Sequence, residues 1–383
     1  MTEFSIASFN VKNLIGADQE YYKFQSYTPE EYAWKEDWLA DQLLTMNADI
    51  VGFQEIFDEA SLKAVIAETD VRGIELNGAV IPDRTKRYRR RAIFRKLAFT
   101  PYTDAAIAFA PNLNDGGPGE RRPGLAILSR FGFVGQPEVI QDFGAGEVIE
   151  FGDGGSFTLT RMSRPILKVR VPVDGKIITV FNCHLKSKLG DFAGNESDLT
   201  QYDPVGRALG SLRAGLRRMA EAWVLRREVT KELTAGNPVM VLGDFNDGQH
   251  TVSSEIISGE TPFKNYAWML RHDAEHRGDR YSDEENIQIT ENINAMHLQS
   301  AEKLFVQKSM RDMVYTSAFG GVFESIDQIL MSRHFLPDTS DTIGHMEYFS
   351  VLNDHLTDGS HPEAPHNKLA SDHGQIIAHM RLD

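Results

Sequence analysis

The first part of the chain alternates between short apolar segments and longer amphipathic ones. Residues 5–11 (SIASFNV) are largely alternating in polarity, which is typical of a strand. Residues 28–48 begin with a threonine suited to an N-cap, a proline at the first helical position and a glutamate three residues after the cap. This pattern predicts a helix. A second strand at 48–56 and a second helix at 61–68 complete a β-α-β-α opening.

Large apolar side chains recur every three or four residues in the predicted helix at 28–48. This spacing places them on one side of a helix, and such a side normally packs against the core. The predicted buried face consists of Trp34, Trp38, Leu39, Leu43 and Met46.

The middle of the chain contains short apolar segments separated by turns rich in Gly, Pro and Asp. These segments are typical of antiparallel strands. They lie at 125–130, 156–162, 165–173 and 176–185. An amphipathic helix at 209–233 then leads into a strand at 238–245, and closing strands are predicted at 324–332 and 371–382.

Residues 249–323 have the weakest pattern of apolar positions. No linker rich in Gly, Pro or polar residues separates this part from the rest of the chain. We therefore predict a single domain, residues 1–383, that carries an elaborated insertion at about 249–323.

The composition is that of an ordinary globular protein: 383 residues, 41% apolar and 25% charged. No segment has the roughly eighteen apolar residues that a membrane span needs, and the start lacks the layout of a signal peptide. The one cysteine, Cys183, excludes an internal disulfide and a Cys-based metal site. We expect a cytoplasmic protein with no membrane association and no obligate protein partner.

The net charge of −15 argues against tight non-specific binding to polyphosphates, which depends on Lys and Arg displacing counterions. It does not exclude turnover of a phosphate ester. One segment is strongly basic, since residues 84–96 (RTKRYRRRAIFRK) hold eight positive charges, and Arg121 and Arg122 follow shortly. The segment is either a loop that contacts phosphate or a solvated basic surface.

Polar residues stand repeatedly at the ends of the predicted strands. Buried carboxylate, amide and imidazole groups are costly unless they pair with one another or bind a charge. We interpret them as groups that converge on one site. They are Asn10, Gln54 and Glu55, His184, Asp244 and Asn246, Asp327, and Asp372 with His373.

The chemistry of this set points to phosphate esters. Carboxylate and amide oxygens are the ligands that Mg²⁺ or Mn²⁺ prefers, and histidines beside carboxylates supply proton transfer. The chain has no HExxH motif and no cysteine ligand pair, which disfavours a zinc peptidase. Together these residues fit metal-assisted attack of water on a phosphate ester.

The same residues belong to short motifs distributed over nearly the whole chain. The motifs are SFNVKNL (8–14), FQEI (53–56), HLKSK (184–188), GDFND (243–247), SIDQIL (325–330) and SDHG (371–374). In this order and spacing they resemble the endonuclease/exonuclease/phosphatase superfamily, which is DNase I-like and includes deoxyribonucleases, apurinic-site endonucleases, inositol polyphosphate phosphatases and neutral sphingomyelinases. The resemblance implies an α/β fold, a four-layer α-β-β-α sandwich of two mixed sheets, with the strand ends meeting at one edge.

The resemblance also implies roles for single residues. Asn10 and Glu55 match the metal-site amide and carboxylate, with Glu55 as the direct ligand of Mg²⁺ or Mn²⁺, and Asp372 matches an additional ligand. Asp244 and Asn246 match the pair that orients the attacking water and the scissile phosphate. The remaining assignments are Asp327 as partner of His373, His373 as phosphate-binding group or general base, His184 as second histidine with Glu120 as the nearby candidate partner, and Arg164, Lys186 and Lys188 as phosphate contacts.

The substrate stays open between three readings. The HLKSK motif and the basic segment favour a nuclease acting on DNA or RNA, whereas the stretch at 324–330 lacks the cysteine and arginine usual in inositol phosphatases. A small-molecule or lipid phosphodiester is the alternative, because the acidic net charge and residues 249–323 are compatible with a closed pocket. An inactive metal-binding interaction scaffold is the third reading, although none of the candidate metal and catalytic residues is missing.

Overall fold

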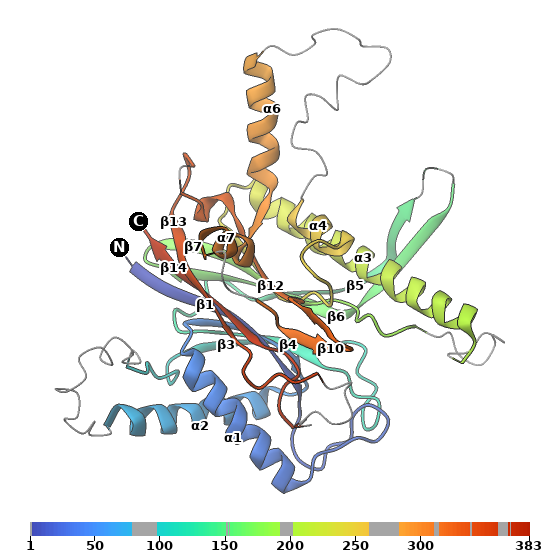
Figure 1. Cartoon of the computed structure of the whole chain (residues 1–383), viewed down its shortest axis with the longest axis vertical. Helices are drawn as coiled ribbons and strands as arrows, with labels where there is room; N and C mark the ends of the chain where they lie inside the picture. The colour runs from blue at the N-terminus through green and yellow to red at the C-terminus, as the bar shows by residue number, and fades with distance from the viewer. Residues whose placement is uncertain are drawn as a thin grey trace.

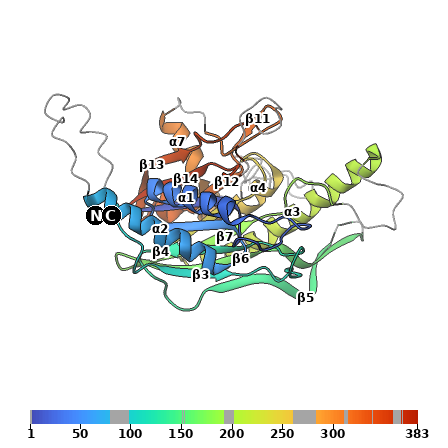
Figure 2. The same cartoon turned by 90° about the horizontal axis from the view of Figure 1, so that it is seen from below.

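The computed structural model describes residues 2–78, 98–150, 152, 154–191, 202–259, 283–309, 314–337, 339–358, 367 and 369–383. Within this part of the chain, two mixed sheets of six strands each face one another (Figures 1 and 2). The first sheet has the order β13 (Gly344–Leu352), β14 (Gln375–Leu382), β1 (Thr2–Leu14), β2 (Ile50–Ile56), β4 (Gly124–Ser129), β3 (Ala106–Ala110). The second has the order β5 (Glu138–Glu150), β6 (Ser156–Val173), β7 (Lys176–His184), β8 (Val239–Asp244), β12 (Asp327–Ser332), β9 (Leu298–Ser300).

Helices cover the outer face of each sheet. α1 (Pro29–Met46) and α2 (Glu59–Gly78) pack their apolar residues on the first sheet, and α3 (Pro204–Thr234) and α4 (Val252–Ser258) pack on the second. A third apolar cluster fills the space between the two sheets. The architecture is therefore the predicted four-layer sandwich, with α1 and α2 on the opposite side from α3 and α4 (Figure 1).

Smaller elements complete the described chain. They are the hairpin of β10 (Ser317–Phe319) and β11 (Val322–Glu324), the helices α6 (Asp283–Met296) and α7 (Ala301–Ser309), and the 3₁₀ turn η3 (Arg333–Phe335). The strand β9, inside the region predicted as an insertion, pairs with β12 at the edge of the second sheet. Among the described residues, no helix is both long and apolar enough to cross a membrane.

The two sheets touch closely between β2 and the second sheet. A side-chain carbon at Gly52 would lie 1.9 Å from a methyl group of Leu242, so a larger residue there would require Leu242 to move. Beside it, the Gln54 amide nitrogen donates to Asn182 Oδ1 (2.7 Å), and the Asn182 amide donates to the carbonyl of Phe53 (3.0 Å). Because buried amides are stable only when paired, these bonds fix how the two sheets sit against one another.

Most predicted elements are present, with different limits. The predicted strands at 156–162 and 165–173 form one continuous strand, β6, and the second helix extends from Glu59 to Gly78. The last strand begins at Gln375, so Asp372 and His373 lie in the turn before it and not within it. The strands β3, β5 and β13 were not predicted from the sequence.

Helix α1 begins as predicted, because Thr28 and Glu31 form a capping box. Its buried face is partly different from the prediction. Leu39, Leu43 and Met46 are buried, but Trp34 is 37% exposed and lies stacked on Trp38. Lys35 takes the buried position next to it, with an exposed fraction of 0%.

Lys35 connects α1 to two backbone segments that lead to candidate site residues. Its ammonium nitrogen donates to the carbonyls of Val11 and Leu369, each at 3.1 Å. Val11 follows Asn10 in β1, and Leu369 lies three residues before Asp372. Burial disfavours the charged amine and lowers the pKa of Lys35 to about 7.

The buried amine makes a prediction about stability and pH. The folded protein releases the Lys35 proton near pH 7, whereas the unfolded chain keeps it up to about pH 10.5. The free energy of unfolding should therefore rise between these pH values, by up to roughly 1.4 kcal/mol per pH unit from this group. Lys35→Met, which cannot titrate, should lack this gain in urea unfolding measured at several pH values.

Lys63→Met is the matched control, since Lys63 is an exposed helix lysine paired with Glu59. Its pH dependence should parallel that of the wild type. If the Lys35→Met curve also runs parallel to the wild type, the amine is not buried as described.

Candidate active site

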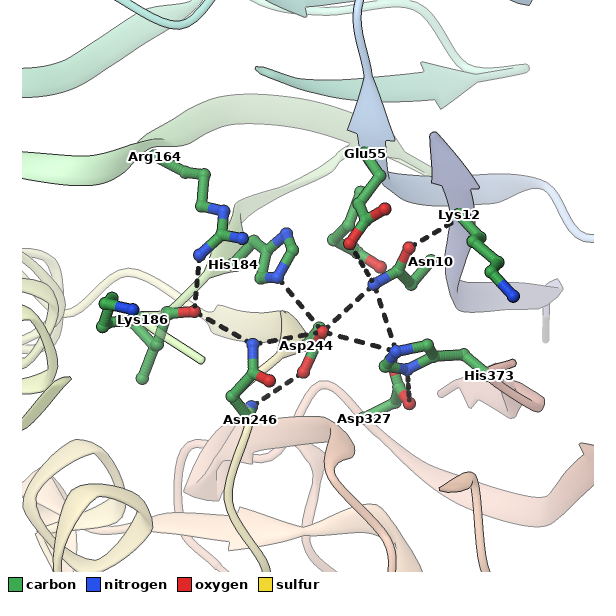
Figure 3. Close-up of polar contacts among 12 residues, drawn as sticks. Asn10, Lys12, Glu55, Arg164, His184, Lys186, Asp244, Asn246, Asp327 and His373 are labelled. Carbon is green, nitrogen blue, oxygen red and sulfur yellow. Dashed lines mark hydrogen bonds and ion pairs between the residues drawn. The ribbon is translucent and has the colours of Figure 1, made fainter. Parts of the chain in front are cut away.

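At one edge of the sandwich the strands β1, β2, β7 and β8 end and the strand β12 begins. In the first sheet β1 and β2 run parallel, with Asn10 beside Gln54. In the second sheet β7 and β8 run parallel, with His184 beside Asp244, and β12 places Asp327 on the other side of Asp244. The polar groups predicted at separate strand ends therefore lie together (Figure 3).

Asp244 lies at the centre of these groups and is 1% exposed. Its Oδ2 accepts a hydrogen bond from the Asn10 amide at 3.1 Å, which joins the two sheets, and lies 3.2 Å from His184 Nε2. Its Oδ1 accepts from the backbone N–H of Asn246 at 2.7 Å. Burial raises the pKa of Asp244 to about 7, opposed by the charge of His373 and reinforced by that of Asp327.

His373 and Asp327 form a close ion pair. The distance between His373 Nδ1 and Asp327 Oδ2 is 2.8 Å, while His373 Nε2 lies 3.8 Å from Asp244 Oδ2. Burial alone would lower the pKa of His373, but the charges of Asp327 and Asp244 outweigh it and raise this pKa well above its ordinary value. His373 is therefore a positively charged imidazolium in the site, with Asp327 as its orienting partner.

His184 differs from His373 in its protonation. It is buried, and burial together with the nearby charges of Arg164 and His373 lowers its pKa well below the ordinary value. Its Nδ1 has no hydrogen-bond partner among the described residues. Glu120, the candidate partner from the sequence, is instead an exposed residue of the loop before β4. His184 is therefore a neutral imidazole at the end of β7.

Two of the predicted site residues have left-handed backbone conformations that non-glycine residues rarely adopt. Glu55 has φ 66° and Asn246 has φ 53°. Such conformations cost on the order of 1–3 kcal/mol each. At Glu55 the result is a carboxylate that accepts hydrogen bonds from the Asn13 backbone (3.0 Å) and the Asn10 amide (3.4 Å).

The site opens into two cavities that share Lys12, Ser187, Leu189, Asp372 and His373. The first, of about 700 Å³, is also lined by Glu55 and by four further cations, Arg122, Arg164, Lys186 and Arg217. The second, of about 790 Å³, is lined by Asn246, Lys188 and the β10–β11 hairpin with Phe319. His373 and Asp372 therefore lie where two arms of one groove meet, with Glu55 in the first arm and Asn246 in the second.

The basic residues predicted to bind phosphate are divided between these arms. Arg164 and Lys186 lie on the His184 side of Asp244, and Lys12 lies beside His373 (Figure 3). Lys188 is in the second arm, where it pairs with Glu324 at 2.9 Å and Asp247 at 3.7 Å. The basic segment at 84–96 lies outside the described residues.

The predicted metal ligands Glu55 and Asp372 line the same cavity, and Asp372 lies 3.7 Å from the Lys12 ammonium. Asn10 presents its amide N–H to Glu55 and its oxygen to the Lys12 backbone, so in this conformation it orients Glu55. Asn13, whose N–H also holds Glu55, leaves a buried side-chain oxygen without a hydrogen-bond partner among the described residues. These hard oxygen donors fit a divalent cation such as Mg²⁺ or Mn²⁺.

A different group of possible ligands lies deeper. One atom each from Asp244, Asp327 and His373 lie within 4.8 Å of one another. Within this cluster the His373 ring is paired with Asp327 at 2.8 Å. The predicted ligands Glu55 and Asp372 are not members of it.

Several residues at the site were not identified from the sequence. Lys12 and Asn13 follow the predicted strand in the left-handed conformation, and Tyr22 and Arg217 line the first cavity. The one signal available was the second asparagine in the stretch NVKN. Arg217 lies inside a long amphipathic helix, where an arginine is ordinarily solvated.

The chain matches the family model described as the Endonuclease/Exonuclease/phosphatase family over residues 7–373. Similar solved structures include the human Nocturnin catalytic domain with bound sulfate (13% identity, 100% of this chain, 94% of that chain, TM-score 0.49). Truncated Caenorhabditis elegans TDP2 is 15% identical, with 99% of this chain and 97% of that chain covered and a TM-score of 0.43. A Bacteroides thetaiotaomicron mannosyl-6-phosphatase is 13% identical, with 99% of each chain covered and a TM-score of 0.45. No curated protein matches the chain.

The close approach of β7 and β8 makes a prediction about stability. Gly243 has φ 144°, and a side-chain carbon there would lie 1.9 Å from the Cys183 carbonyl oxygen. Gly243→Ala should lower the free energy of unfolding by about 2 kcal/mol or more, because the strands that carry His184 and Asp244 must separate. Gly215→Ala, in open space on α3, should instead be neutral or slightly stabilising in the same urea titrations. Equal stability of both variants would contradict the packing of β7 on β8.

Proposed function

The chain belongs to the Endonuclease/Exonuclease/phosphatase family, and from this we propose that it is a divalent-metal-dependent phosphodiesterase, most specifically a nuclease that hydrolyses DNA or RNA. The observation that carries the proposal is the convergence of Glu55 and Asn10 from one sheet with His184, Asp244 and Asp327 from the other, beside a cation-lined cavity. Such a centre offers groups for water attack and for the negative charge that grows on phosphate.

In the proposed mechanism, the residues of the two sheets hold opposite sides of the scissile phosphate. The imidazolium of His373, kept charged by Asp327, binds a phosphate oxygen. Asp244 and Asn246 orient the attacking water, and the Asp244 carboxylate accepts its proton. As the water oxygen bonds to phosphorus, the P–O bond to the leaving oxygen breaks, and that oxygen takes up a proton from solvent. Arg164 adds positive charge from the side of His184.

Glu55 and Asp372 would hold Mg²⁺ or Mn²⁺, with Asn10 and Asn13 keeping Glu55 in place. The cation, when bound, supplies charge that offsets the developing negative charge on the phosphate. The strained backbone at Glu55 supports this role, because a conformation of that cost is retained where it aims a side chain at a functional position.

A nucleic acid substrate is favoured by the groove. Its two arms meet beside His373 and Asp372, so the groove has room for more of a chain substrate than one phosphate, and one arm is rich in cations. A small-molecule or lipid phosphodiester is the second candidate, because the arms are bounded cavities. The single cysteine is buried and unpaired, which fits a cytoplasmic location. Nucleic acid, as substrate, is the expected partner.

Turnover assays separate these functions. The protein would be incubated with plasmid DNA, single-stranded DNA, RNA and bis-p-nitrophenyl phosphate, each with Mg²⁺, Mn²⁺ or EDTA. Metal-dependent cleavage of a polymer is the expected result. Cleavage of the small ester alone would favour the small-diester function, and no turnover with any metal would favour an inactive scaffold.

His373→Ala tests the phosphate-binding imidazolium. Turnover should fall by about 10² or more, since general acid–base and charge-stabilising groups contribute at least this much. Thermal unfolding should remain cooperative. His345→Ala, on the exposed edge strand β13, is the control and should keep wild-type turnover. Near-native rates for His373→Ala would refute the assigned role.

Glu55→Gln tests the metal-binding role. The amide keeps the shape of the side chain but loses its charge, so half-maximal activity should require a Mg²⁺ concentration at least about tenfold higher. Glu59→Gln, a surface residue paired with Lys63, provides the comparison. Superimposable Mg²⁺ titrations for Glu55→Gln and the wild type would count against ligation.

A further inference from the structure

The first cavity contains cations that the proposed hydrolysis does not use. Arg122 comes from the loop before β4, and Arg217 comes from the middle of α3. Lys186 follows the end of β7. All three line the cavity that also holds Arg164 and His373. Three separate elements therefore direct positive charge into one space.

Tyr22 connects Arg122 to the catalytic side of the cavity. The Arg122 guanidinium lies 5.5 Å from the centre of the Tyr22 ring, a cation–π distance. Burial raises the pKa of the Tyr22 hydroxyl, and the nearby charge of Arg164 opposes this rise. The ring packs on Phe57 at 5.8 Å between centres. Arg122 thus stands next to Arg164 across one fixed aromatic ring.

Lys186 lies near both Arg164 and Arg217 in the same cavity. Burial lowers the pKa of Lys186, and the charges of Arg164 and Arg217 lower it further, partly offset by Asp191 and Glu221. The Lys186 ammonium donates to the Leu189 carbonyl at 3.1 Å. Arg164 and Arg217 therefore repel the Lys186 ammonium, and Asp191 within the cavity offsets this repulsion only in part.

Arg217 is incompletely paired. It donates to the Arg161 carbonyl at 2.8 Å, but its buried Nε has no hydrogen-bond partner among the described residues. The nearest carboxylate oxygen, from Glu221, is 3.6 Å away and also accepts from the Ser163 backbone. The Arg217 side chain as a whole is partly exposed, but a buried N–H donor without a partner costs free energy unless an acceptor such as an anion completes it.

Cationic side chains outnumber carboxylates around the first cavity. Five cationic side chains, Lys12, Arg122, Arg164, Lys186 and Arg217, stand against three carboxylates. Two of these three, Glu55 and Asp372, are the proposed metal ligands, which leaves Asp191. A cavity of about 700 Å³ also has the volume of a site for a whole small molecule, more than one phosphate group needs.

We propose that Arg122, Lys186 and Arg217 form a subsite for a second phosphate group of the substrate, separate from the phosphate that is hydrolysed. The inference rests on the proposed phosphodiesterase function and narrows its substrate class. The substrate carries at least two phosphates, and the uncleaved one lies on the Arg164 side of the scissile bond. Guanidinium groups suit this task because they bind phosphate oxygens through two parallel donors.

Matched pairs of substrates test the subsite. One pair is a dinucleotide with one internal phosphodiester, compared with the same dinucleotide carrying an additional terminal phosphate at its 5′ or 3′ end. The other pair has no base: a p-nitrophenyl phosphodiester of propanediol, with and without a terminal phosphate. In the wild type, the extra phosphate should raise kcat/KM by at least about tenfold in one or both pairs.

Arg122→Gln should reduce this preference several-fold and act mainly through KM, because it removes a contact to the uncleaved phosphate. Arg217→Gln should act in the same direction, with thermal unfolding measured in parallel because Arg217 also holds the Arg161 carbonyl. Arg227→Gln is the control: Arg227 lies on the same helix with the same side-chain exposure of 33%, but pairs with Glu147.

The outcomes are distinct. A preference in both pairs that Arg122→Gln reduces supports a general phosphate subsite, and a preference confined to the dinucleotides supports one that also needs a nucleoside. Equal kcat/KM for the members of both pairs would overturn the subsite while leaving the phosphodiesterase function intact. So would a preference that Arg122→Gln and Arg227→Gln leave at the same value. No turnover of any substrate would instead contradict the proposed function itself.

Discussion

The hydrogen bond between Asn10 and Asp244 is the contact on which the site depends, since it joins a residue of the first sheet to one of the second at 3.1 Å. It forms only if the two sheets have one relative position. Gly52 permits the close approach, and the buried Gln54–Asn182 pair holds it with hydrogen bonds that would be lost on sliding. The catalytic geometry is thus a consequence of how the sandwich packs.

Charge balance at that contact accounts for the different states of the two histidines. His373 has a carboxylate on each ring nitrogen side and is held as an imidazolium. His184, equally buried, has Arg164 nearby and an unpaired Nδ1, so it stays neutral. Two histidines that look alike in the sequence thereby differ in charge, and the site combines one cationic donor with one neutral imidazole.

Most strands and the location of the site were predictable from the sequence, because strands and active-site motifs leave local signals. The ends of β1, β2, β7, β8 and β12 carry polar residues where an apolar strand should simply stop, and this irregularity located the site. The missed strand β5 has no continuous buried face, so its sequence lacks the alternation by which strands are identified. Lys35 was missed for the opposite reason, because a lysine in an amphipathic helix normally points to solvent.

The clustering of Arg122, Lys186 and Arg217 in the first cavity could not be predicted from the sequence either. Arg122 had been noted only as a neighbour of a basic segment, and Arg217 belongs to a helix with several exposed arginines. Their proximity to Tyr22 and Lys186 is a tertiary property, produced by the packing of α3 and the loop before β4 around the end of β7. Residues that are far apart in the sequence and meet only through tertiary packing leave no periodic pattern in the sequence.

The most direct measurement of the central claim is the anomalous scattering of Mn²⁺ in crystals of the wild-type protein. We expect a peak at the Glu55 carboxylate, near Asn10 and Asp372, and loss of the peak in Glu55→Gln. A Mn²⁺ peak remote from Glu55, or one that persists unchanged in Glu55→Gln, would contradict it.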